Sequence, residues 1–272
     1  MSTESPVLSP RSVADFWTVV AITAIVHALG SLLHEGLGHG GACLAIGAHP
    51  VSLTSVYFDC SRDSRWVSAA GTLANFAAGL VCWLLLRRSR QSSPRLRYFL
   101  WLLMTLNLLD GAGYFLFSGV GNIGDWADVI RGLQPAWVWH AGLAVLGAGL
   151  YFLLVCVAAR ELLRFLPAGE DRWRTARRLT WLPYVAGGII SCIAGAFNPQ
   201  GMIFVAISAA AASFGGASGL IWMSWFMASA PRWFPPSPEP FRPLTHSRSW
   251  IIAGCIVAAL FIFGLGRGAT FH

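Results

Sequence analysis

Long apolar segments separated by polar links constrain this chain more than any other feature of its sequence. A helix needs about 20 apolar residues to cross the hydrocarbon core of a bilayer. Segments of about that length, or longer, occur seven times, at residues 16–47, 66–86, 98–120, 137–166, 179–197, 202–228 and 250–265. Because lipid offers no hydrogen bonds, each segment must satisfy its backbone internally as a helix. The sequence therefore predicts an all-α, polytopic membrane helix bundle of about seven transmembrane spans.

Composition agrees with a membrane location and argues against a soluble domain or a nucleic-acid-binding protein. Of the 272 residues, 56% are hydrophobic and 11% are charged, and the mean hydropathy is +0.60. The net charge of +7 lies in the links, where anionic headgroups of the lipid bilayer are the expected partners. The chain has no basic stripe with interleaved aromatic residues, so no nucleic acid is expected.

The arginines indicate an orientation in the membrane. All 19 basic residues are arginine, a usage that suggests a GC-rich bacterial genome. They are concentrated in the second, fourth and sixth links, at residues 87–97, 160–178 and 232–248, whereas the third link has only Arg131. Cytoplasmic loops carry an excess of Lys and Arg. We therefore expect an inner (plasma) membrane protein of a bacterium, with its N-terminus in the cytoplasm.

The sequence divides into three segments that differ in composition. Residues 1–12 contain two prolines and an acid, and we expect a disordered or interfacial lead. Residues 13–135 hold the polar residues considered below, and residues 136–272 add further transmembrane helices. Residues 51–58, rich in Val, Thr, Tyr and Phe, follow a Gly-Ala-His-Pro turn and predict a short β-strand at the membrane surface.

Polar residues that carry chemistry occur inside the first span, in the sequence Ser-Leu-Leu-His-Glu-Gly-Leu-Gly-His at residues 31–39. Histidine and glutamate are costly to bury in an apolar segment, which favours a functional role over simple packing. Neutral imidazoles bind zinc, and a neighbouring carboxylate can take a proton from the bound water. The usual motif, H-E-x-x-H, spaces its histidines four apart, whereas His34 and His39 are five apart.

The extra residue predicts a distorted helix. In a regular α-helix, five residues turn two side chains about 140° away from each other. A π-bulge adds one residue to a turn and so returns His34 and His39 to one side. Gly36 and Gly38 ease the distortion because glycine has few backbone restrictions. We therefore predict a π-bulge or a local break at residues 36–38 if both histidines bind one metal ion.

Later segments supply candidates for the rest of a metal site. Asp110 lies roughly halfway through the third span, and its carboxylate would complete a two-histidine zinc site with one position left for water. Asp59, Asp125 and Asp128 lie in links on the same predicted side and could each replace Asp110 as a ligand, although surface or capping roles are commoner. In the second span, Asn75 could donate a hydrogen bond to a developing oxyanion.

Other histidines and cysteines near the motif have simpler interpretations. His27 lies seven residues before His34 and on the same helix face, where packing is favoured over a place in an access channel. Cys43 and Cys60 lie near the proposed site, but a ligand role for either is the less favoured hypothesis.

These pieces, in this order, resemble the site-2-protease family of intramembrane zinc metalloproteases. The family's H-E-x-x-H, Ala-Gly-Pro-Leu-Ala-Asn-like and Asn…Leu-Asp-Gly segments are similar to residues 34–39, 71–75 and 107–111. Besides the extra residue in the first segment, threonine replaces the usual proline in the second, and the third is shortened and lacks its internal proline. The resemblance covers roughly residues 20–120.

The resemblance implies a membrane-embedded zinc-dependent hydrolase, first of all an intramembrane metallopeptidase. His34, His39 and Asp110 would bind Zn²⁺, Glu35 would be the general base, and Asn75 would be a catalytic donor. The implied substrate is a transmembrane or membrane-adjacent protein, which the predicted strand could hold in extended form by edge pairing. Two further hypotheses stay open. One is a non-catalytic relative that binds metal or substrate, and the other is a zinc-dependent lipid hydrolase.

Overall fold

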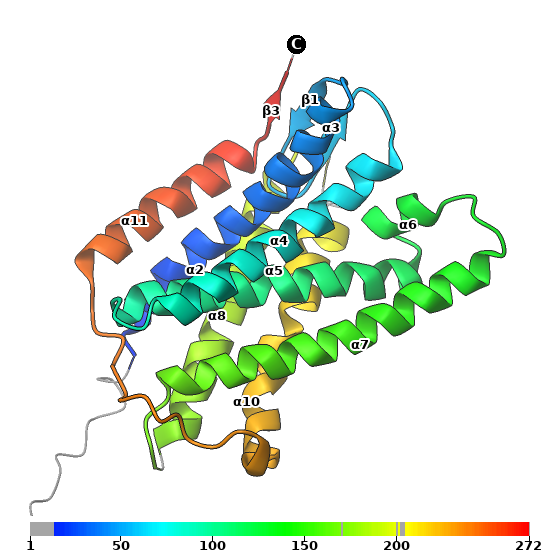
Figure 1. Ribbon diagram of the computed structural model, residues 1–272. Coiled ribbons are helices and arrows are strands. Elements are labelled where there is room, and N and C mark those ends of the chain that lie inside the picture. The colour runs from blue at the N-terminus through cyan, green and yellow to red at the C-terminus, as the bar shows by residue number, and fades with distance from the viewer. Residues whose placement is uncertain (1–13, 170, 200, 202–204, 272) are drawn as a thin grey trace, which may run out of the picture.

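The computed structural model describes residues 14–169, 171–199, 201 and 205–271. The expected lead at residues 1–12 lies outside this part of the chain. The described residues form a helical bundle with a small sheet at one end (Figure 1). Six of the described helices are long and apolar enough to cross a membrane. The all-α bundle is therefore confirmed, and its apolar helices indicate an integral membrane protein.

The helices follow the predicted apolar segments closely. They are α2 (Phe16–Ser31), continued by η1 (Leu32–Gly40) and α3 (Gly41–Ala45); α4 (Arg65–Arg88); α5 (Pro94–Gly121); α7 (Ala136–Leu162), continued by η2 (Leu163–Phe165); α8 (Asp171–Ala196); and α11 (Arg248–Ala259), continued by η6 (Leu260–Leu265). A short helix, α6 (Asp125–Ile130), lies between α5 and α7. The side chains of Asp15, Ser64 and Ser93 accept hydrogen bonds from first-turn amides of α2, α4 and α5 and so define where these helices begin.

The predicted span at residues 202–228 is not one regular helix. Residues 202–204 lie outside the described part of the chain. Beyond them follow the π-helix η3 (Val205–Gly215), the 3-10 turn η4 (Gly216–Ser218), α10 (Gly219–Ser229) and a second 3-10 turn, η5 (Pro231–Trp233). Irregular backbone at membrane depth is tolerated where it is buried in protein or lines a cavity. Parts of η3 and η4 do line a cavity, as shown below.

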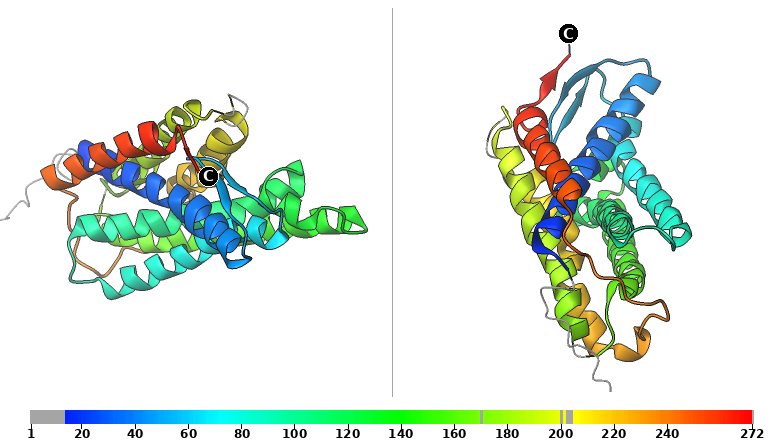
Figure 2. Two further views of the ribbon diagram at one scale, coloured as in Figure 1. Left: turned by 90° about the horizontal axis from the view of Figure 1, so that it is seen from above. Right: turned by 90° about the vertical axis from the view of Figure 1, so that its left-hand side faces the viewer.

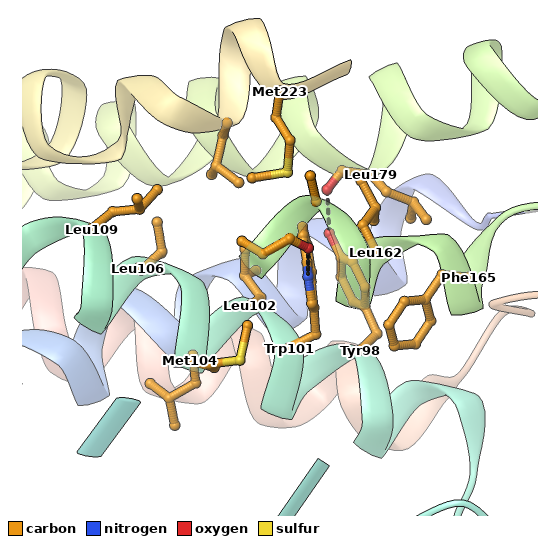
Figure 3. Close-up of a cluster of buried hydrophobic side chains, with 14 of the residues drawn as sticks. Tyr98, Trp101, Leu102, Met104, Leu106, Leu109, Leu162, Phe165, Leu179 and Met223 are labelled. Atoms are coloured by element: carbon orange, nitrogen blue, oxygen red, sulfur yellow. Dashed lines mark hydrogen bonds between the residues drawn. The ribbon is translucent and has the colours of Figure 1, made fainter. Parts of the chain in front are cut away.

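The hydrophobic core is centred on α5, which packs chiefly against α4 and α7 and reaches α8 through Tyr98. The Tyr98 hydroxyl donates a hydrogen bond to the carbonyl oxygen of Leu179 at 2.8 Å, and Trp101 Nε1 donates to that of Ala158 at 2.9 Å (Figure 3). These bonds matter because a buried polar group without a partner is costly. The core draws its side chains from both the N-terminal and the C-terminal halves of the chain.

The small sheet has three antiparallel strands in the order β2–β1–β3: β1 (Pro50–Leu53), β2 (Phe58–Cys60) and β3 (Ala269–Thr270). The predicted single strand at residues 51–58 is instead a hairpin. Its turn is closed by a hydrogen bond from Thr54 N to Tyr57 O at 2.8 Å. Because β1 lies between two partners, β2 keeps one edge that pairs with no described strand.

The two ends of the bundle differ. The sheet, α3 and α6 lie at one end (Figure 1). The α4–α5, α7–α8 and α10–α11 links lie at the opposite end and hold the arginine-rich sequences. There, Arg97 Nη2 lies 2.7 Å from Glu239 Oε2 and ties the last link to α5. Figure 2 shows α11 alongside α2, where a Cβ added at Gly254 would lie 2.6 Å from Ala21 Cα.

Candidate metal site and its cavity

The π-helix η1 brings the two motif histidines together. Its residues 32–40 are π-helical, so the wider turn compensates for the extra residue in the motif. His34 Nε2 and His39 Nε2 lie 3.2 Å apart, and both side chains are buried. The predicted distortion at residues 36–38 is therefore confirmed.

Asp125 completes a group of three potential ligands. It is the first residue of α6 and follows Gly124, whose φ of 89° favours glycine. Its Oδ2 atom lies 3.2 Å from His34 Nε2 and 3.6 Å from His39 Nε2. The three ligand atoms all lie within 4.8 Å of one another. Two imidazole nitrogens and one carboxylate oxygen at these distances could bind a metal ion.

Hydrogen bonding and stacking orient the two histidine rings. His39 Nδ1 lies 2.7 Å from the carbonyl oxygen of Val67 in α4. Because a carbonyl can only accept, Nδ1 carries the hydrogen, and Nε2 of the neutral ring is left for a metal. The ring of Tyr114 in α5 stacks on His34, with centroids 4.7 Å apart and planes inclined by 16°.

The surroundings of Asp125 favour its charged form. Burial raises the pKa of Asp125, but the charges of His34 and His39 and hydrogen bonds from His34 and Thr72 lower it, and the result is a pKa below the ordinary value. Thr72 Oγ1 lies 3.5 Å from Asp125 Oδ2. The ionised form is the one in which a carboxylate binds a metal ion.

Glycines allow α4 to approach η1 closely. A Cβ added at Gly38 would lie 2.6 Å from Gly71 Cα. A Cβ added at Gly71 would lie 2.5 Å from His39 Nε2 and 2.7 Å from His34 Nε2. Position 71 therefore faces the space between the two nitrogen atoms, where a metal ion would lie. The small residues of this segment let the two backbones come together.

The ligand group opens onto a cavity of about 920 Å³. Glu35, whose exposed fraction is 7%, lines it together with His39. Residues 56–60, in and before β2, line a second part of the wall. The C-terminal half contributes Tyr151 of α7 and residues of η3 and η4, including Gly216. The last spans, which take no part in the family resemblance, thus help to enclose the cavity.

The structure gathers Asp125, not the expected Asp110, beside the histidines. Asp110 lines the cavity from α5, but it does not belong to the ligand group. Its Oδ1 atom is enclosed and has no hydrogen-bond partner among the described residues. It lies against Gly216, where an added Cβ would collide with it. Asp59 and Asp128, which the sequence also offered as ligands, line the cavity without joining the group.

The remaining candidates lie apart from the ligand group. Asn75 is 3% exposed, and its Oδ1 atom has no hydrogen-bond partner within the described chain. It is not among the cavity-lining residues, so its role as a donor stays a prediction. His27 Nδ1 lies 3.1 Å from Ser191 Oγ in α8, which agrees with packing. Cys43 and Cys60 form a disulfide, which leaves neither thiol free to bind a metal.

The sequence did not single out Tyr114 as a residue of the site. It favoured Asp110 over Asp125 as the third ligand. An acid in the first turn of a short helix is a common capping pattern, so its local sequence did not distinguish Asp125 from Asp128. Tyr114 comes four residues after Asp110 and so shares its helix face, a signal that the sequence did contain.

Comparisons with protein-family models, with curated proteins and with solved structures found no match to this chain.

Gly71→Ala should displace the metal. The added methyl group would occupy the space between the imidazoles, and we expect zinc affinity to fall about 10- to 100-fold, as for other disturbed ligand geometries. Metal content after equilibration in zinc buffers measures this. Gly30→Ala is the control, because a Cβ at that position meets no atom within 4 Å. Unchanged zinc affinity in Gly71→Ala would place the metal elsewhere.

Asp125→Asn and Asp110→Asn should separate the two possible third ligands. We expect Asp125→Asn to weaken zinc binding about 100-fold, because it removes an ionised ligand, and Asp110→Asn to weaken it less than about tenfold. Competition with a zinc chelator of known affinity measures both values. The reverse order would return Asp110 to the site as the third ligand.

Proposed function

We propose that this chain is a membrane-embedded zinc-dependent hydrolase, and specifically an intramembrane metallopeptidase. One observation carries the proposal. The π-helix η1 places His34 Nε2 and His39 Nε2 3.2 Å apart, and Glu35 lines the same cavity as His39. Three protein ligands with an open position are typical of catalytic zinc sites. The resemblance to the site-2-protease family supports the same function, with Asp125 taking the part expected of Asp110.

The site residues would divide the hydrolysis between them. His34, His39 and Asp125 would hold a zinc ion, which would supply Lewis-acid chemistry to a water molecule and to the substrate carbonyl. Glu35 takes a proton from the water as the water oxygen forms a bond to the carbonyl carbon of the substrate amide. The carbonyl electron pair moves to its oxygen and returns as the C–N bond breaks. Glu35 then delivers the proton to the departing nitrogen.

The sheet supports a peptide as the substrate. One of the two outer strands of the described sheet is β2, whose free edge is next to residues 56–57, and residues 56–60 line the cavity. An extended peptide can add to such an edge through main-chain hydrogen bonds. This matters because a helical peptide bond is shielded by its own hydrogen bonds and must be opened before it is cleaved. A lipid amide or ester has no extended peptide backbone that could pair with a strand edge. A peptide substrate is therefore favoured over a lipid.

We also propose that the cavity faces the non-cytoplasmic side of a bacterial inner membrane. The arginine-rich links lie at the end opposite to the sheet, and the positive-inside rule assigns that end to the cytoplasm. The Cys43–Cys60 disulfide lies near the site, and disulfides persist in oxidising compartments such as the periplasm. The substrates would then be transmembrane or membrane-adjacent proteins exposed on that side.

Glu35→Gln should separate metal binding from turnover. We expect one zinc per chain in both the wild type and the variant, because Glu35 is not a ligand, and a loss of hydrolysis of about 100- to 10,000-fold. Elemental analysis and cleavage of fluorogenic transmembrane peptides in detergent measure the two properties. A zinc-loaded wild type that cleaves none of the peptides would favour the non-catalytic relative. Bound iron would instead indicate an oxygenase-type site.

Reporter fusions test the orientation. Fusions of green fluorescent protein after Arg90 and after Arg174 should fluoresce, and alkaline phosphatase at the same points should be inactive, because both links are expected in the cytoplasm. A fusion after Arg131, which follows α6 at the site end, should show the opposite pattern. Active phosphatase after Arg90 or Arg174 would contradict the proposed orientation.

A further inference from the structure

We infer that Tyr114 is a further catalytic residue, whose hydroxyl donates a hydrogen bond to the oxyanion that develops on the substrate carbonyl. This inference rests on the proposed function, because it concerns the transition state of the hydrolysis proposed above. Nothing in the family resemblance assigns a role to this position, and the support for it comes from the geometry of the cavity.

Amide hydrolysis needs a donor at the carbonyl oxygen. Negative charge develops there as water attacks, and loss of one preorganised donor typically costs about 100- to 1,000-fold in rate. The residue that the sequence pattern offered for this task, Asn75, is buried and is not among the residues that line the cavity. A donor must therefore come from the side chains that line the cavity.

The other large side chains of the cavity wall that could donate a hydrogen bond are either engaged elsewhere or exposed. The Tyr151 hydroxyl donates to Gly216 O at 2.6 Å and accepts from Gly219 N at 2.7 Å, so it is engaged in holding η4. Arg62 is exposed. Tyr57 is already engaged in an interaction of its own within the protein.

Tyr114 lies beside the ligand group. Its ring stacks on His34 at 4.7 Å, and it lines the cavity that contains Glu35. Glu35, Asp110 and the ligand Asp125 line the same cavity as Tyr114. No hydrogen bond engages this hydroxyl within the described chain. Hydroxyls inside a protein normally have a hydrogen-bond partner. Because the Tyr114 hydroxyl has none within the described chain, it is available to a molecule in the cavity.

The role is donation of a hydrogen bond without proton transfer. As the water oxygen bonds to the carbonyl carbon, the carbonyl π electrons move onto oxygen, and the Tyr114 O–H bond points its hydrogen at that charge. A phenol keeps its proton at neutral pH, so Glu35 alone carries the transferred proton. When the C–N bond breaks, the electron pair returns and the hydrogen bond weakens. Tyr114 therefore stabilises the transition state more than the ground state.

Tyr114→Phe tests the inference because it keeps the ring that stacks on His34 and removes only the hydroxyl. The control is Tyr184→Phe, the same chemical change at a ring that packs against Phe214 and does not line the cavity. Both variants and the wild type are loaded with cobalt(II), whose visible spectrum reports ligand binding. Two probes are titrated: an acetylated trialanine with a phosphinate in place of one amide, which mimics the oxyanion, and azide, which binds metal alone.

We expect Tyr114→Phe to bind the phosphinate about 10- to 100-fold more weakly, as expected for one hydrogen bond to a charged group. Its cobalt content and azide affinity should match the wild type, and Tyr184→Phe should be unchanged throughout. With cleavable peptides, kcat should fall while KM stays the same. Unchanged phosphinate affinity would overturn the role of Tyr114 alone. If azide affinity falls as much as phosphinate affinity, Tyr114 has a structural role and not a catalytic one. If the wild type binds no cobalt, the proposed function is overturned as well.

Discussion

The site depends on the packing of α4 against the π-helix η1. A π-turn is rare, and its surroundings must hold it in place. Here the contact of Gly38 with Gly71 brings the two backbones together, and the Val67 carbonyl accepts from His39 Nδ1 at 2.7 Å. The Cys43–Cys60 disulfide ties the segment after η1 to β2. Without this support, a regular helix would turn the two histidines apart.

The C-terminal half gives the site its enclosure. A cavity that holds charged side chains within a bilayer needs a protein wall on every side that would otherwise meet lipid. Tyr151 and the irregular segments η3 and η4 provide part of that wall, and Gly216 leaves room for the Asp110 carboxylate. Residues beyond 135 therefore belong to the same structural unit as the motif, through a core that both halves share.

Helix positions were predictable from the sequence because their cause is local. Residues 66–86 and 98–120 were expected as spans, and the structure has α4 at Arg65–Arg88 and α5 at Pro94–Gly121. The distortion of η1 was also predictable, since the angle per residue fixes where side chains five apart must point. The segment after residue 201 was harder, because hydropathy reports the length of an apolar stretch and not the hydrogen-bond pattern inside it.

The sequence by itself determined the apolar spans, the arginine-rich links and the pairing of His34 with His39 on a distorted helix. Only the tertiary structure decided which carboxylate joins them. Asp110 and Asp125 are both plausible by burial cost and donor chemistry, but α6 turns back after Gly124 and brings Asp125 within 3.2 Å of His34. Tyr114 and the free edge of β2 were decided in the same way. Contacts between elements depend on how helices approach one another, and no spacing along the chain encodes that distance.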